Sequence, residues 1–447
     1  MITLETIETA VYELCKKANT QYSADLYKKL VNKYNICESK DEKCKLAYIL
    51  KNIEVAHDSN RPLCQDTGQV IVFLEIGTGA KLETGDLYYA VNKAVANCYT
   101  EQFYRKSTVN DALCDRVNTN NNTPAIIYTS ISDKDEITID VLIKGAGAEN
   151  CSALKMLSPT AEKTEIFDFV KEVLTNAGKK ACPPITIGIG IGGTMDYAAV
   201  LSKKAFFSPN TNKNIEKELN NYLGNDDILD LKILTSGTHI ASMPIAVTLN
   251  CHSTRHSSCT IHNNKIFFKV NKPDYIPVTL NSENIPEIRT DDILTIKNLK
   301  SGENILLSGE IYTARDAAHK KLQELVDNNL PLPFNLENKI IFYAGPCPNR
   351  EDEVIGPIGP TTAARMDKYI DLTYGNGVIA TIGKGERSKE AEKKIKTYNG
   401  RYFTADGGIS CLLSQCVIKS ECIAFEELGT EAIRKLEICR LPLKIEY

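Results

Sequence analysis

Three of the fifteen cysteines in this chain stand in loops that are rich in glycine, proline and polar residues. They are Cys64 in PLCQDTGQ, Cys182 in KKACPPITIGIGIGGT and Cys251 in NCHSTRHSSC. Loops held on a rigid scaffold bring side chains from distant parts of a chain into one pocket, and catalytic metal sites use such loops. For any one of the three, a buried structural thiol is the simpler interpretation. Their shared setting favours a fold that gathers all three.

Composition excludes several classes of protein. The chain has 447 residues, enough for about three domain-sized units, and a net charge of −4 without a basic block, so no nucleic-acid partner is expected. No window approaches the roughly 18 consecutive apolar residues of a membrane helix. The acidic N-terminal residues and the odd, scattered set of cysteines predict a cytoplasmic chain without a disulfide framework.

Apolar periodicity predicts a mixed α/β first part. In the first 55 residues apolar side chains recur every three or four positions, which is typical of helices. We expect strands at 69–76, 137–143, 184–187 and 244–251, and further helices at 86–105, 161–177 and 196–207.

The periodicity fails between residues 261 and 292, where the sequence is polar, rich in asparagine and interrupted by proline. This composition predicts an extended connection, and we place a domain boundary near residue 270. Beyond it the pattern predicts strands at 304–307 and 339–343, a helix at 314–327 and a helix that opens after Pro360.

Polar clusters in the second part predict a small acidic substrate. The clusters cover residues 308–322, 342–348, 356–369 and 382–388. Arginine, which recurs in three of them, holds a carboxylate through two parallel hydrogen bonds. Gly-Pro-Thr-Thr before a predicted helix offers hydroxyls and backbone N–H groups to an anion. Lys320 and Lys321 fit a solvated helix face, whereas Arg365 has apolar neighbours.

Two rival sites are open to the sequence. Four possible zinc ligands lie within nine residues at Cys251, His252, His256 and Cys259, although adjacent residues of a continuing strand would point to opposite sides. Gly188, Gly190 and Gly193 spell GxGxxG before a helix, as in dinucleotide-binding proteins, but the predicted strand before them is short and no acid ends a second strand.

Taken together, the motifs resemble the class I fumarate hydratases and the related L-tartrate dehydratases, which are iron–sulfur hydro-lyases. The motifs that carry the resemblance are PLCQDTG, KGAGAEN (144–150), ACPPITIGIGIGGT, SGTHIASMPIAVTLNCHSTRH (236–256), YTARDAAH, YAGP, GPTTAARMD and IGKG. Their occurrence in family order across most of the chain is more specific than any one of them.

The resemblance implies a mixed α/β fold in two parts. Residues 1–270 would form the larger, cluster-bearing α-type catalytic domain, and residues 271–447 a smaller swivelling β/α domain of β type that clamps the substrate. Related enzymes often carry these parts as separate subunits. The resemblance also implies a homodimer.

The same resemblance implies which residues form the site. Cys64, Cys182 and Cys251 would hold a 4Fe-4S cluster with one iron not ligated by cysteine, which suits a hydro-lyase because an open iron can bind substrate oxygen. Asp66 and Thr361 would be catalytic, with Asp66 or Lys384 as candidate groups that activate the Thr361 hydroxyl. The implied substrate-binding residues are Gln65, Arg105, Gly145, His239, Arg315, Arg365 and Lys384. Where the family has KGGGSEN, this chain has KGAGAEN, so Ala146 and Ala148 alter the local fit to the substrate.

The expected reaction is the reversible hydration of fumarate to (S)-malate, with a small dicarboxylate as the only predicted partner apart from a second copy. L-tartrate and mesaconate stay open as substrates, because carboxylate clamps are common to all three. From other classes, a nicotinamide-dependent dehydrogenase would use the glycines at 188–193. A non-catalytic iron–sulfur sensor would require a fourth ligand, for which Cys151 or Cys259 could serve.

Overall fold

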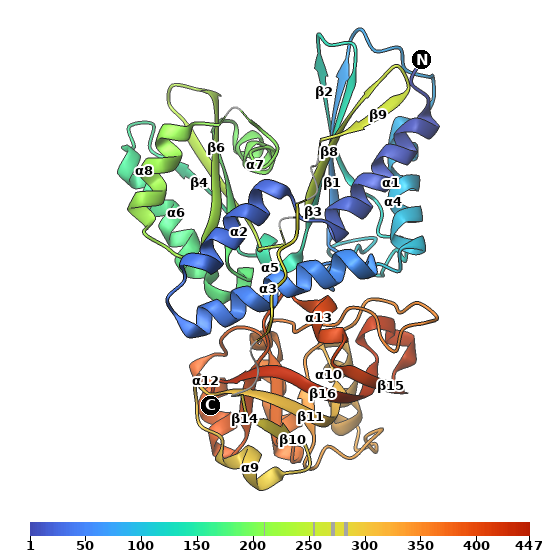
Figure 1. Cartoon of the computed structure of the whole chain (residues 1–447), viewed down its shortest axis with the longest axis vertical. Coiled ribbons are helices and arrows are strands. Elements are labelled where there is room, and N and C mark those ends of the chain that lie inside the picture. The colour runs from blue at the N-terminus through green and yellow to red at the C-terminus, as the bar shows by residue number, and fades with distance from the viewer. Residues whose placement is uncertain (210, 254, 270–272, 281–284) are drawn as a thin grey trace. The chain divides into compact units, whose positions relative to one another are not determined.

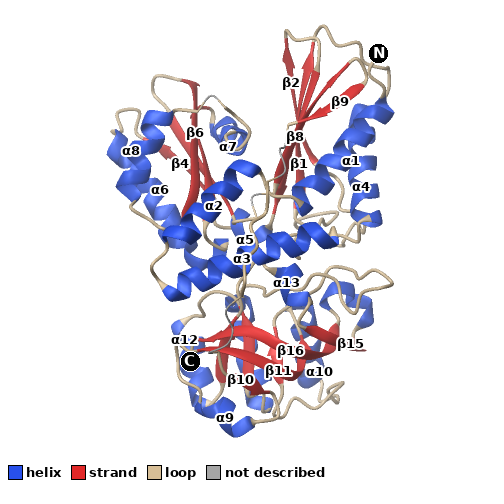
Figure 2. Ribbon diagram, viewed as in Figure 1, coloured by secondary structure: helices blue, strands red, loops and turns tan. Residues whose placement is uncertain are grey.

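The computed structural model describes residues 1–209, 211–253, 255–269, 273–280 and 285–447 (Figure 1). Internal contacts divide the chain into two units. Unit 1 comprises Met1–Cys37 and Asp66–Ile276, and unit 2 comprises Glu38–Gln65 and Pro277–Tyr447. Both units combine helices and sheets (Figure 2), so the predicted α/β class is confirmed. The predicted boundary at residue 270 lies outside the described residues, and the assignment of catalysis and clamping to the two sides of it stays a prediction.

The first sheet of unit 1 has the strand order β2-β1-β3-β8-β9. Its strands are β1 (Gln69–Gly77), β2 (Ile126–Ser132), β3 (Ile137–Lys144), β8 (His256–His262) and β9 (Lys265–Phe268). Helices α1 (Leu4–Thr20) and α4 (Leu87–Glu101) pack on it with buried apolar faces. The alternation of Ile137, Ile139, Val141 and Ile143 points these side chains into this core, as the period of a strand requires.

The second sheet of unit 1 has the order β4-β7-β5-β6. Its strands are β4 (Ala153–Leu157), β5 (Ile185–Gly193), β6 (Ile228–Thr238) and β7 (Met243–Asn250), and the other helices of unit 1 are α2 (Ala24–Ile36), α5 (Ala146–Glu149), α6 (Lys163–Ala177), α7 (Met195–Lys204) and α8 (Lys213–Leu223). Ile187 and Ile189 of β5 are buried in one core with α6 and α8. A short 3-10 turn, Gly178–Ala181, precedes the Cys182 loop.

The glycines of GIGIGG belong to a strand, which overturns the dinucleotide-binding interpretation. Gly188 and Gly190 lie inside β5, where a Cβ would stand 2.1 Å from Ser202 O and 2.2 Å from Ala198 O of α7. Both glycines therefore allow α7 to pack directly on the strand. Only Gly192 (φ 96°) and Gly193 (φ 72°) adopt the left-handed conformations of a turn.

Part of the predicted connection between 261 and 292 is wrong. Residues His256–His262 and Lys265–Phe268 form the antiparallel hairpin β8–β9. Asn263 and Asn264 at its tip have φ values of 48° and 64°, the left-handed pair that a two-residue hairpin turn needs. The asparagines that suggested an extended connection form the turn of this hairpin.

Unit 2 is built on one sheet with the order β10-β11-β12-β13-β14-β16-β15. The strands are β10 (Glu287–Arg289), β11 (Asn304–Thr313), β12 (Ile340–Phe342), β13 (Ala380–Gly383), β14 (Arg401–Thr404), β15 (Val417–Ala424) and β16 (Ile433–Ile445). The helices are α3 (Lys40–Ser59), α9 (Ile293–Asn298), α10 (Asp316–Asp327), α11 (Ile370–Thr373), α12 (Lys389–Thr397) and α13 (Ser410–Ser414), with 3-10 turns at Ala363–Tyr369, Tyr374–Asn376 and Glu426–Glu431. An additional pairing between β11 and β16 closes the central strands into a ring.

Strands β11, β12, β13 and β14 run parallel to one another. Their carboxyl ends therefore meet at one edge, which is where open α/β sheets bind ligands. The motifs YTARDAAH, YAGP and IGKG each begin at or just after the last residues of one of these strands. This topology gathers segments that are far apart in the sequence.

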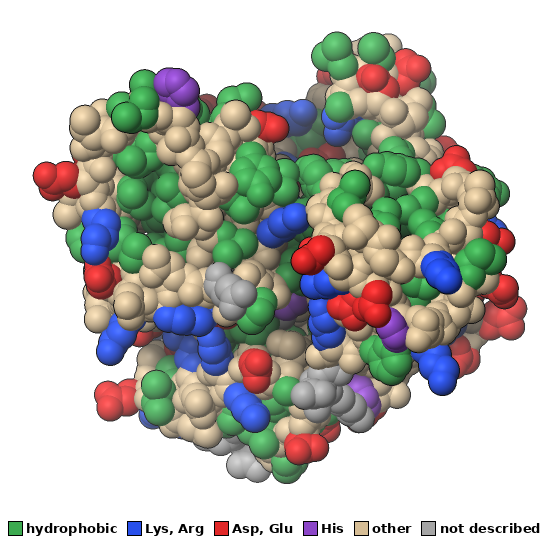
Figure 3. All heavy atoms as spheres, turned by 90° about the horizontal axis from the view of Figure 1, so that it is seen from above, with side chains coloured by type: hydrophobic (Ala, Val, Ile, Leu, Met, Phe, Trp, Pro, Cys, Tyr) green, Lys and Arg blue, Asp and Glu red, His purple; other side chains and the backbone are tan. Residues whose placement is uncertain are grey.

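Charged side chains are dispersed over the face drawn in Figure 3. Lys and Arg stand there in small groups among Asp and Glu, without a continuous basic stripe, as expected for a sequence with no basic block. In the described part of the chain, no helix combines the length and the apolar character needed to cross a membrane.

Helix α3 and the loop after it are held within unit 2 by buried polar contacts. Asn52, which is 1% exposed, donates to Leu63 O (3.0 Å) and Gly408 O (3.2 Å) and accepts from Leu412 N (3.0 Å). Arg61, which is 2% exposed, pairs with Glu353 (2.9 Å). Because buried polar groups are costly when unpaired, these contacts hold the loop that leads to Cys64.

We predict that Asn52→Ala lowers the free energy of unfolding of unit 2 by about 2–4 kcal/mol, because it removes three buried hydrogen bonds to the backbone and leaves Leu63 O with only a 3.5 Å contact from Ser410 Oγ. Urea unfolding followed by circular dichroism measures the change. The matched control is Asn328→Ala, which removes an exposed side-chain contact to Glu324 O and should alter stability by less than about 0.5 kcal/mol. Equal effects of the two substitutions would contradict the assignment.

Candidate active site

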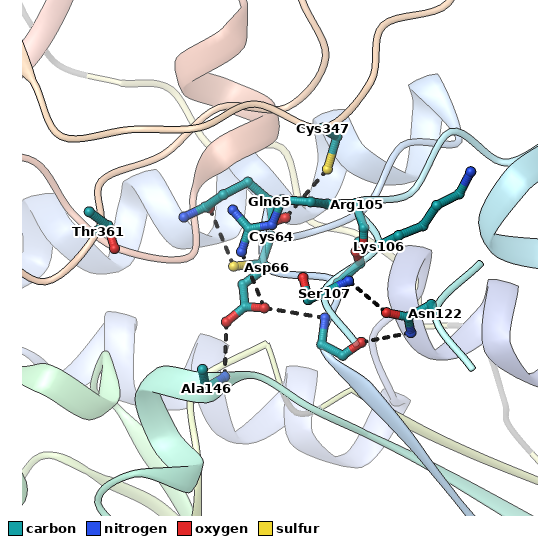
Figure 4. Close-up of polar contacts among 12 residues, drawn as sticks. Cys64, Gln65, Asp66, Arg105, Lys106, Ser107, Asn122, Ala146, Cys347 and Thr361 are labelled. Atoms are coloured by element: carbon teal, nitrogen blue, oxygen red, sulfur yellow. Dashed lines mark hydrogen bonds and ion pairs between the residues drawn. The ribbon is translucent and has the colours of Figure 1, made fainter. Parts of the chain in front are cut away.

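In unit 1, both carboxylate oxygens of Asp66 have hydrogen-bond donors (Figure 4). Asp66 Oδ1 lies 3.3 Å from Arg105 Nη2 and 3.3 Å from Gly68 N. Asp66 Oδ2 accepts from Ala146 N at 3.0 Å. The structure thus brings three predicted residues together, Asp66, Arg105 and the segment at Gly145, and fixes the direction of the carboxylate.

The loop that carries Arg105 is bound to the loop that carries Asp66. Thr67 Oγ1 donates to Arg105 O at 2.7 Å. The buried Asn122 accepts from Ser107 N (2.8 Å) and donates to Gly68 O (3.1 Å), as Figure 4 shows. Asn122 lies in a polar stretch that gave no signal in the sequence.

Gly145 has no side chain, and this allows Arg255 and Asp66 to lie close to its backbone. A Cβ at this position would stand 2.4 Å from Arg255 Nη2 and 3.1 Å from Asp66 Oδ2. Arg255 is 4% exposed and its Nη1 donates to Asp66 O. Sequence reasoning missed Arg255, although it lies inside the NCHSTRH motif. Ala146 is exposed and contributes its N–H to Asp66, whereas Ala148 is buried.

Cys182 and Cys251 lie at the same edge of the second sheet. Strands β5 and β7 are antiparallel neighbours with Thr186 opposite Asn250, so the loop before β5 and the loop after β7 meet. Cys182 O accepts from His252 N at 3.3 Å, which joins the two loops directly. Cys182 has φ 57°, a left-handed conformation that is uncommon for a residue with a side chain and that occurs at functional sites.

Lys144 of the KGAGAEN motif holds the end of β7 just before Cys251. Its ammonium is fully buried, donates to Leu249 O and to Asn250 Oδ1 (2.8 Å), and pairs with Glu149 at 3.4 Å. Burial lowers the pKa of Lys144 to about 8, and Glu149 opposes that shift. A buried cation with three oxygen partners restrains the strand end from which the Cys251 loop leaves.

Cys259 is a core residue, which removes it as a metal ligand. It lies in β8 with 0% exposure, in the apolar core beneath α1 and α4, and burial raises the pKa of its thiol to about 12. The zinc interpretation and the choice of Cys259 as a fourth cluster ligand are therefore wrong. Both interpretations relied on the short separation of these residues in sequence, but Cys251 follows β7 in one sheet and Cys259 lies in β8 of the other sheet.

His239 lies away from the two cysteines. It is exposed in the turn between β6 and β7, where its Nδ1 accepts from Ala241 N at 3.1 Å. Strand β7 runs from this turn to Cys251, and its seven steps span roughly 24 Å. Within unit 1 the structure does not bring His239 to Cys182 and Cys251.

In unit 2, Gln65 packs against the GPTT motif. Gln65 Nε2 donates to Pro360 O at 3.3 Å, and a Cβ on Gly359 would stand 2.6 Å from Gln65 Oε1. The Cys64 thiol lies 3.4 Å from the same Oε1, and Cys347 Sγ lies 3.4 Å from Gln65 O (Figure 4). Cys64 and Gln65 therefore lie beside the residue that precedes Thr361.

Thr361 is part of an extended segment between two strand ends. Thr361 N donates to Tyr343 O (2.7 Å), Lys384 N to Thr361 O (3.0 Å) and Ala363 N to Lys384 O (3.0 Å). The predicted helix after Pro360 begins only at Ala363, and it begins as a 3-10 turn. Of the backbone N–H groups expected at Gly-Pro-Thr-Thr for an anion, that of Thr361 is already donated to a carbonyl, and so is that of Ala363, the next residue after the motif.

Two predicted clamp arginines meet at one carboxylate. Arg365 Nη2 lies 3.0 Å from Asp316 Oδ2, and Arg315 Nη2 lies 3.9 Å from the same oxygen and 3.2 Å from Glu431. Arg365 also donates to Thr361 Oγ1. Asp316, which sequence reasoning did not select, therefore connects the predicted substrate-binding residues of YTARDAAH and GPTTAARMD.

His319 lies directly behind Arg315. Its ring is fully buried against Tyr343 and Tyr369, with centroids 5.5 and 5.3 Å away, and its Nδ1 lies 2.8 Å from Arg315 O. Burial lowers the pKa of His319 to about 4; the carboxylates of Asp316 and Glu431 oppose this shift and the Arg387 cation adds to it. His319 is therefore neutral near pH 7.

The thiols fit an iron–sulfur cluster by chemistry, since such clusters take cysteine thiolates. Two of the three predicted ligands share one sheet edge in unit 1, and Cys64 belongs to unit 2. Among the residues that the structure describes, no group of three or more His, Cys, Asp or Glu forms a metal site.

Comparison with known proteins gives the same family for both parts of the chain. Residues 8–260 match the family described as fumarate hydratase, and residues 262–446 match the family described as fumarase C-terminus. The aerobic class I fumarate hydratase of Escherichia coli K12 is 31% identical over 90% of this chain and 81% of that protein.

Two chains of Methanocaldococcus jannaschii match the two parts separately. The putative L(+)-tartrate dehydratase subunit alpha is 35% identical over 56% of this chain and 96% of its own length. The putative subunit beta is 40% identical over 32% of this chain and 76% of its own length. The two parts thus correspond to two separate subunits in that organism.

We predict that acid destabilises the wild type through His319. Its pKa is about 4 in the folded chain and about 6.5 when unfolded, so between these values the unfolded state binds more protons and stability falls as the pH is lowered. From pH 7.5 to pH 5 the loss should exceed that of His319→Gln by about 2 kcal/mol. Urea unfolding at both pH values tests this, with His262→Gln, at a half-buried histidine beside Asp135, as the control. Identical pH dependence in wild type and His319→Gln would refute it.

Proposed function

Because the chain belongs to the fumarate hydratase family, we propose that it is a hydro-lyase that catalyses the reversible hydration of fumarate to (S)-malate. The observation that carries this proposal is the contact of Arg365 with both Thr361 Oγ1 and Asp316, with Arg315 beside the same carboxylate. Two guanidinium groups next to a hydroxyl provide what a dicarboxylate substrate needs, namely charge recognition and a group that can exchange a proton.

For the dehydration direction we propose that Thr361 Oγ1, as the alkoxide left after its hydroxyl proton passes to solvent, receives the proton from C3 of malate, while the hydroxyl lost from C2 takes up a proton and leaves as water. A threonine hydroxyl is a weak base, so its deprotonated form requires stabilisation. The guanidinium of Arg365 already donates to this oxygen and supplies that stabilisation. Asp66, one expected activator of Thr361, accepts from Arg105, Gly68 and Ala146 within unit 1, and its action on Thr361 stays a prediction.

We further propose that Cys64, Cys182 and Cys251 hold a 4Fe-4S cluster with one iron that no cysteine ligates. When bound, the cluster supplies Lewis-acid chemistry for the loss or addition of the hydroxyl at C2. The proposal uses residues of both units, with Gln65, Arg105, Arg315, Arg365 and Lys384 as substrate-binding groups and Gly145 as the point of close approach. His239 is retained as a substrate-binding residue only on the resemblance.

L-tartrate is the alternative substrate, because the two Methanocaldococcus jannaschii relatives bear the name of a tartrate dehydratase. Mesaconate is a candidate substrate only because the same carboxylate-binding residues would hold it. The cytoplasmic location, the homodimer and the swivelling of the second part stay predictions. Comparison of kcat/KM for fumarate, L-tartrate and mesaconate in anaerobic enzyme decides between the substrates, and a higher value for L-tartrate would overturn fumarate.

We predict that Cys64→Ser, Cys182→Ser and Cys251→Ser each abolish fumarate hydration and the iron and labile sulfide of the anaerobically purified protein, because serine replaces the thiolate that the cluster requires. Chemical assay of iron and sulfide measures the loss. Cys422→Ser, at a half-buried cysteine in β15, is the control and should keep both. Zinc in place of iron, or full activity in any of the three variants, would contradict the cluster.

We predict that Thr361→Ala lowers kcat by about a hundredfold or more with the iron content unchanged, since positioned acid–base groups contribute 10²–10⁴. Steady-state kinetics with fumarate and malate measure it. Thr397→Ala, which removes an exposed hydroxyl bonded to Lys393 O, is the control and should retain kcat within about threefold. Arg365→Lys should raise KM and lower kcat together, because a point charge replaces neither the bidentate clamp nor the contact to Thr361. A Thr361→Ala enzyme with wild-type kcat would remove Thr361 from the chemistry.

A further inference from the structure

A buried ion pair that the proposed mechanism does not use lies against the parallel strands of the unit 2 sheet. Arg387, whose side chain is 0% exposed, donates from Nε to Asp367 Oδ1 at 2.8 Å. Asp367 Oδ2 accepts from Ser388 N at 3.0 Å. A buried cation is costly unless it is paired and hydrogen-bonded, so each residue of this pair depends on the other.

The Arg387 guanidinium also contacts residues in or next to three neighbouring strands. It stacks over the rings of Tyr343 and Tyr402, 5.5 Å from each centroid, and its Nη1 lies 3.2 Å from Tyr343 OH and 3.3 Å from Thr381 Oγ1. Tyr343 directly follows β12, Thr381 lies within β13 and Tyr402 lies within β14. One side chain therefore fixes the 3-10 turn of Asp367 against the parallel strands.

The segments joined by this pair are those that carry the proposed substrate-binding groups. Asp367 lies two residues after Arg365, and Arg387 lies three residues after Lys384. The backbone of Thr361 is bonded on one side to Tyr343 O and on the other to Lys384 N. A shift of the Asp367 turn relative to Arg387 would thus move Thr361, Arg365 and Lys384 relative to one another.

We infer that Asp367 and Arg387 are positioning residues for Thr361, Arg365 and Lys384, and that Tyr343 is the third member of the set. The identity of the substrate in this inference rests on the proposed function. The positioning role of Asp367 and Arg387 applies to any dicarboxylate that Thr361, Arg365 and Lys384 bind. His319 packs its ring against Tyr343 and its Nδ1 lies at Arg315 O, so the substrate-binding residue Arg315 is supported through the same tyrosine.

Asp367→Asn and Arg387→Lys in the iron-loaded full chain test the inference. Each should lower kcat/KM for fumarate by about ten- to a hundredfold, because a misplacement of about 1 Å near the chemistry has effects of this size. The loss should appear in both KM and kcat, since a clamp and a proton-transfer group move together. The dissociation constant of succinate, a dicarboxylate that cannot react, should rise in parallel, while iron content stays at the wild-type level.

Asp371→Asn is the matched control. Asp371 lies one helical turn after Asp367 and pairs at the surface with Lys394 (2.7 Å) and Tyr398 OH (3.0 Å). The same change from carboxylate to amide at this position should leave kcat, KM and succinate binding unchanged.

Wild-type kcat, KM and succinate binding in folded Asp367→Asn and Arg387→Lys would overturn the inference. If both variants fail to fold, Tyr343→Phe decides, because it removes the hydroxyl that Arg387 contacts and keeps the ring: a rise in KM of about threefold or more supports the role, and unchanged kinetics refute it. If the wild type does not hydrate fumarate, the proposed function fails by itself, and the succinate dissociation constants of the variants still decide the inference.

Discussion

The peptide bond between Gln65 and Asp66 is the constraint on which the rest of the proposed site depends. Contacts assign Cys64 and Gln65 to unit 2 and Asp66 to unit 1, yet consecutive Cα atoms are 3.8 Å apart, so Cys64 and Asp66 can be no more than about 7.6 Å apart at Cα. Unit 2 presents Cys64 beside the GPTT motif, and unit 1 binds Asp66 at the Arg105 and Gly145 loops. The PLCQDTG motif is therefore the covalent link between two groups of polar residues, each ordered by its own unit. The motif suits this position because its consecutive side chains have different partners: Gln65 contacts Pro360 in unit 2, and Asp66 contacts Arg105 and Ala146 in unit 1.

Each unit orders its residues by placing loops at a sheet edge. In unit 2 the parallel strands β11, β12 and β13 end at Thr313, Phe342 and Gly383, and Arg315, the segment at Thr361 and Lys384 follow or pair with those ends. In unit 1 the antiparallel pair β5 and β7 achieves the same result by bringing the start of one strand to the end of the other. The strands determine where each loop begins, and the contacts of buried groups such as Lys144 and Arg387 determine the path of the loop.

Strand and helix periodicity predicted most elements of the fold, and the loop motifs predicted most of the residues that the structure gathers within each unit. The failures have a common cause, since each concerns a role set by a tertiary neighbour. Gly188 and Gly190 match a phosphate-binding pattern in sequence, but their lack of a side chain serves the packing of α7. Asn263 and Asn264 suggest a connection, but their left-handed backbone turns a hairpin. Nothing in the sequence distinguishes Asp316 and Arg255 from other charged residues, but in the fold Asp316 pairs with Arg365 and Arg255 donates to Asp66 O. The sequence could not predict such partners because they come from segments far apart along the chain.

The partner of the Thr361 hydroxyl shows what the structure adds to the chemistry. From the sequence, Asp66 or Lys384 were the candidates to activate Thr361, and each would act differently: a carboxylate would take the proton, and an ammonium would stabilise the oxygen after its loss. The contact with Arg365 favours the second kind of assistance, in which a cation stabilises the oxygen. A guanidinium has five N–H donors, so Arg365 can contact Thr361, Asp316 and a substrate carboxylate at the same time. Recognition of the substrate and stabilisation of the base would then depend on one side chain. For this reason its segment needs a rigid support such as the buried pair of Asp367 and Arg387.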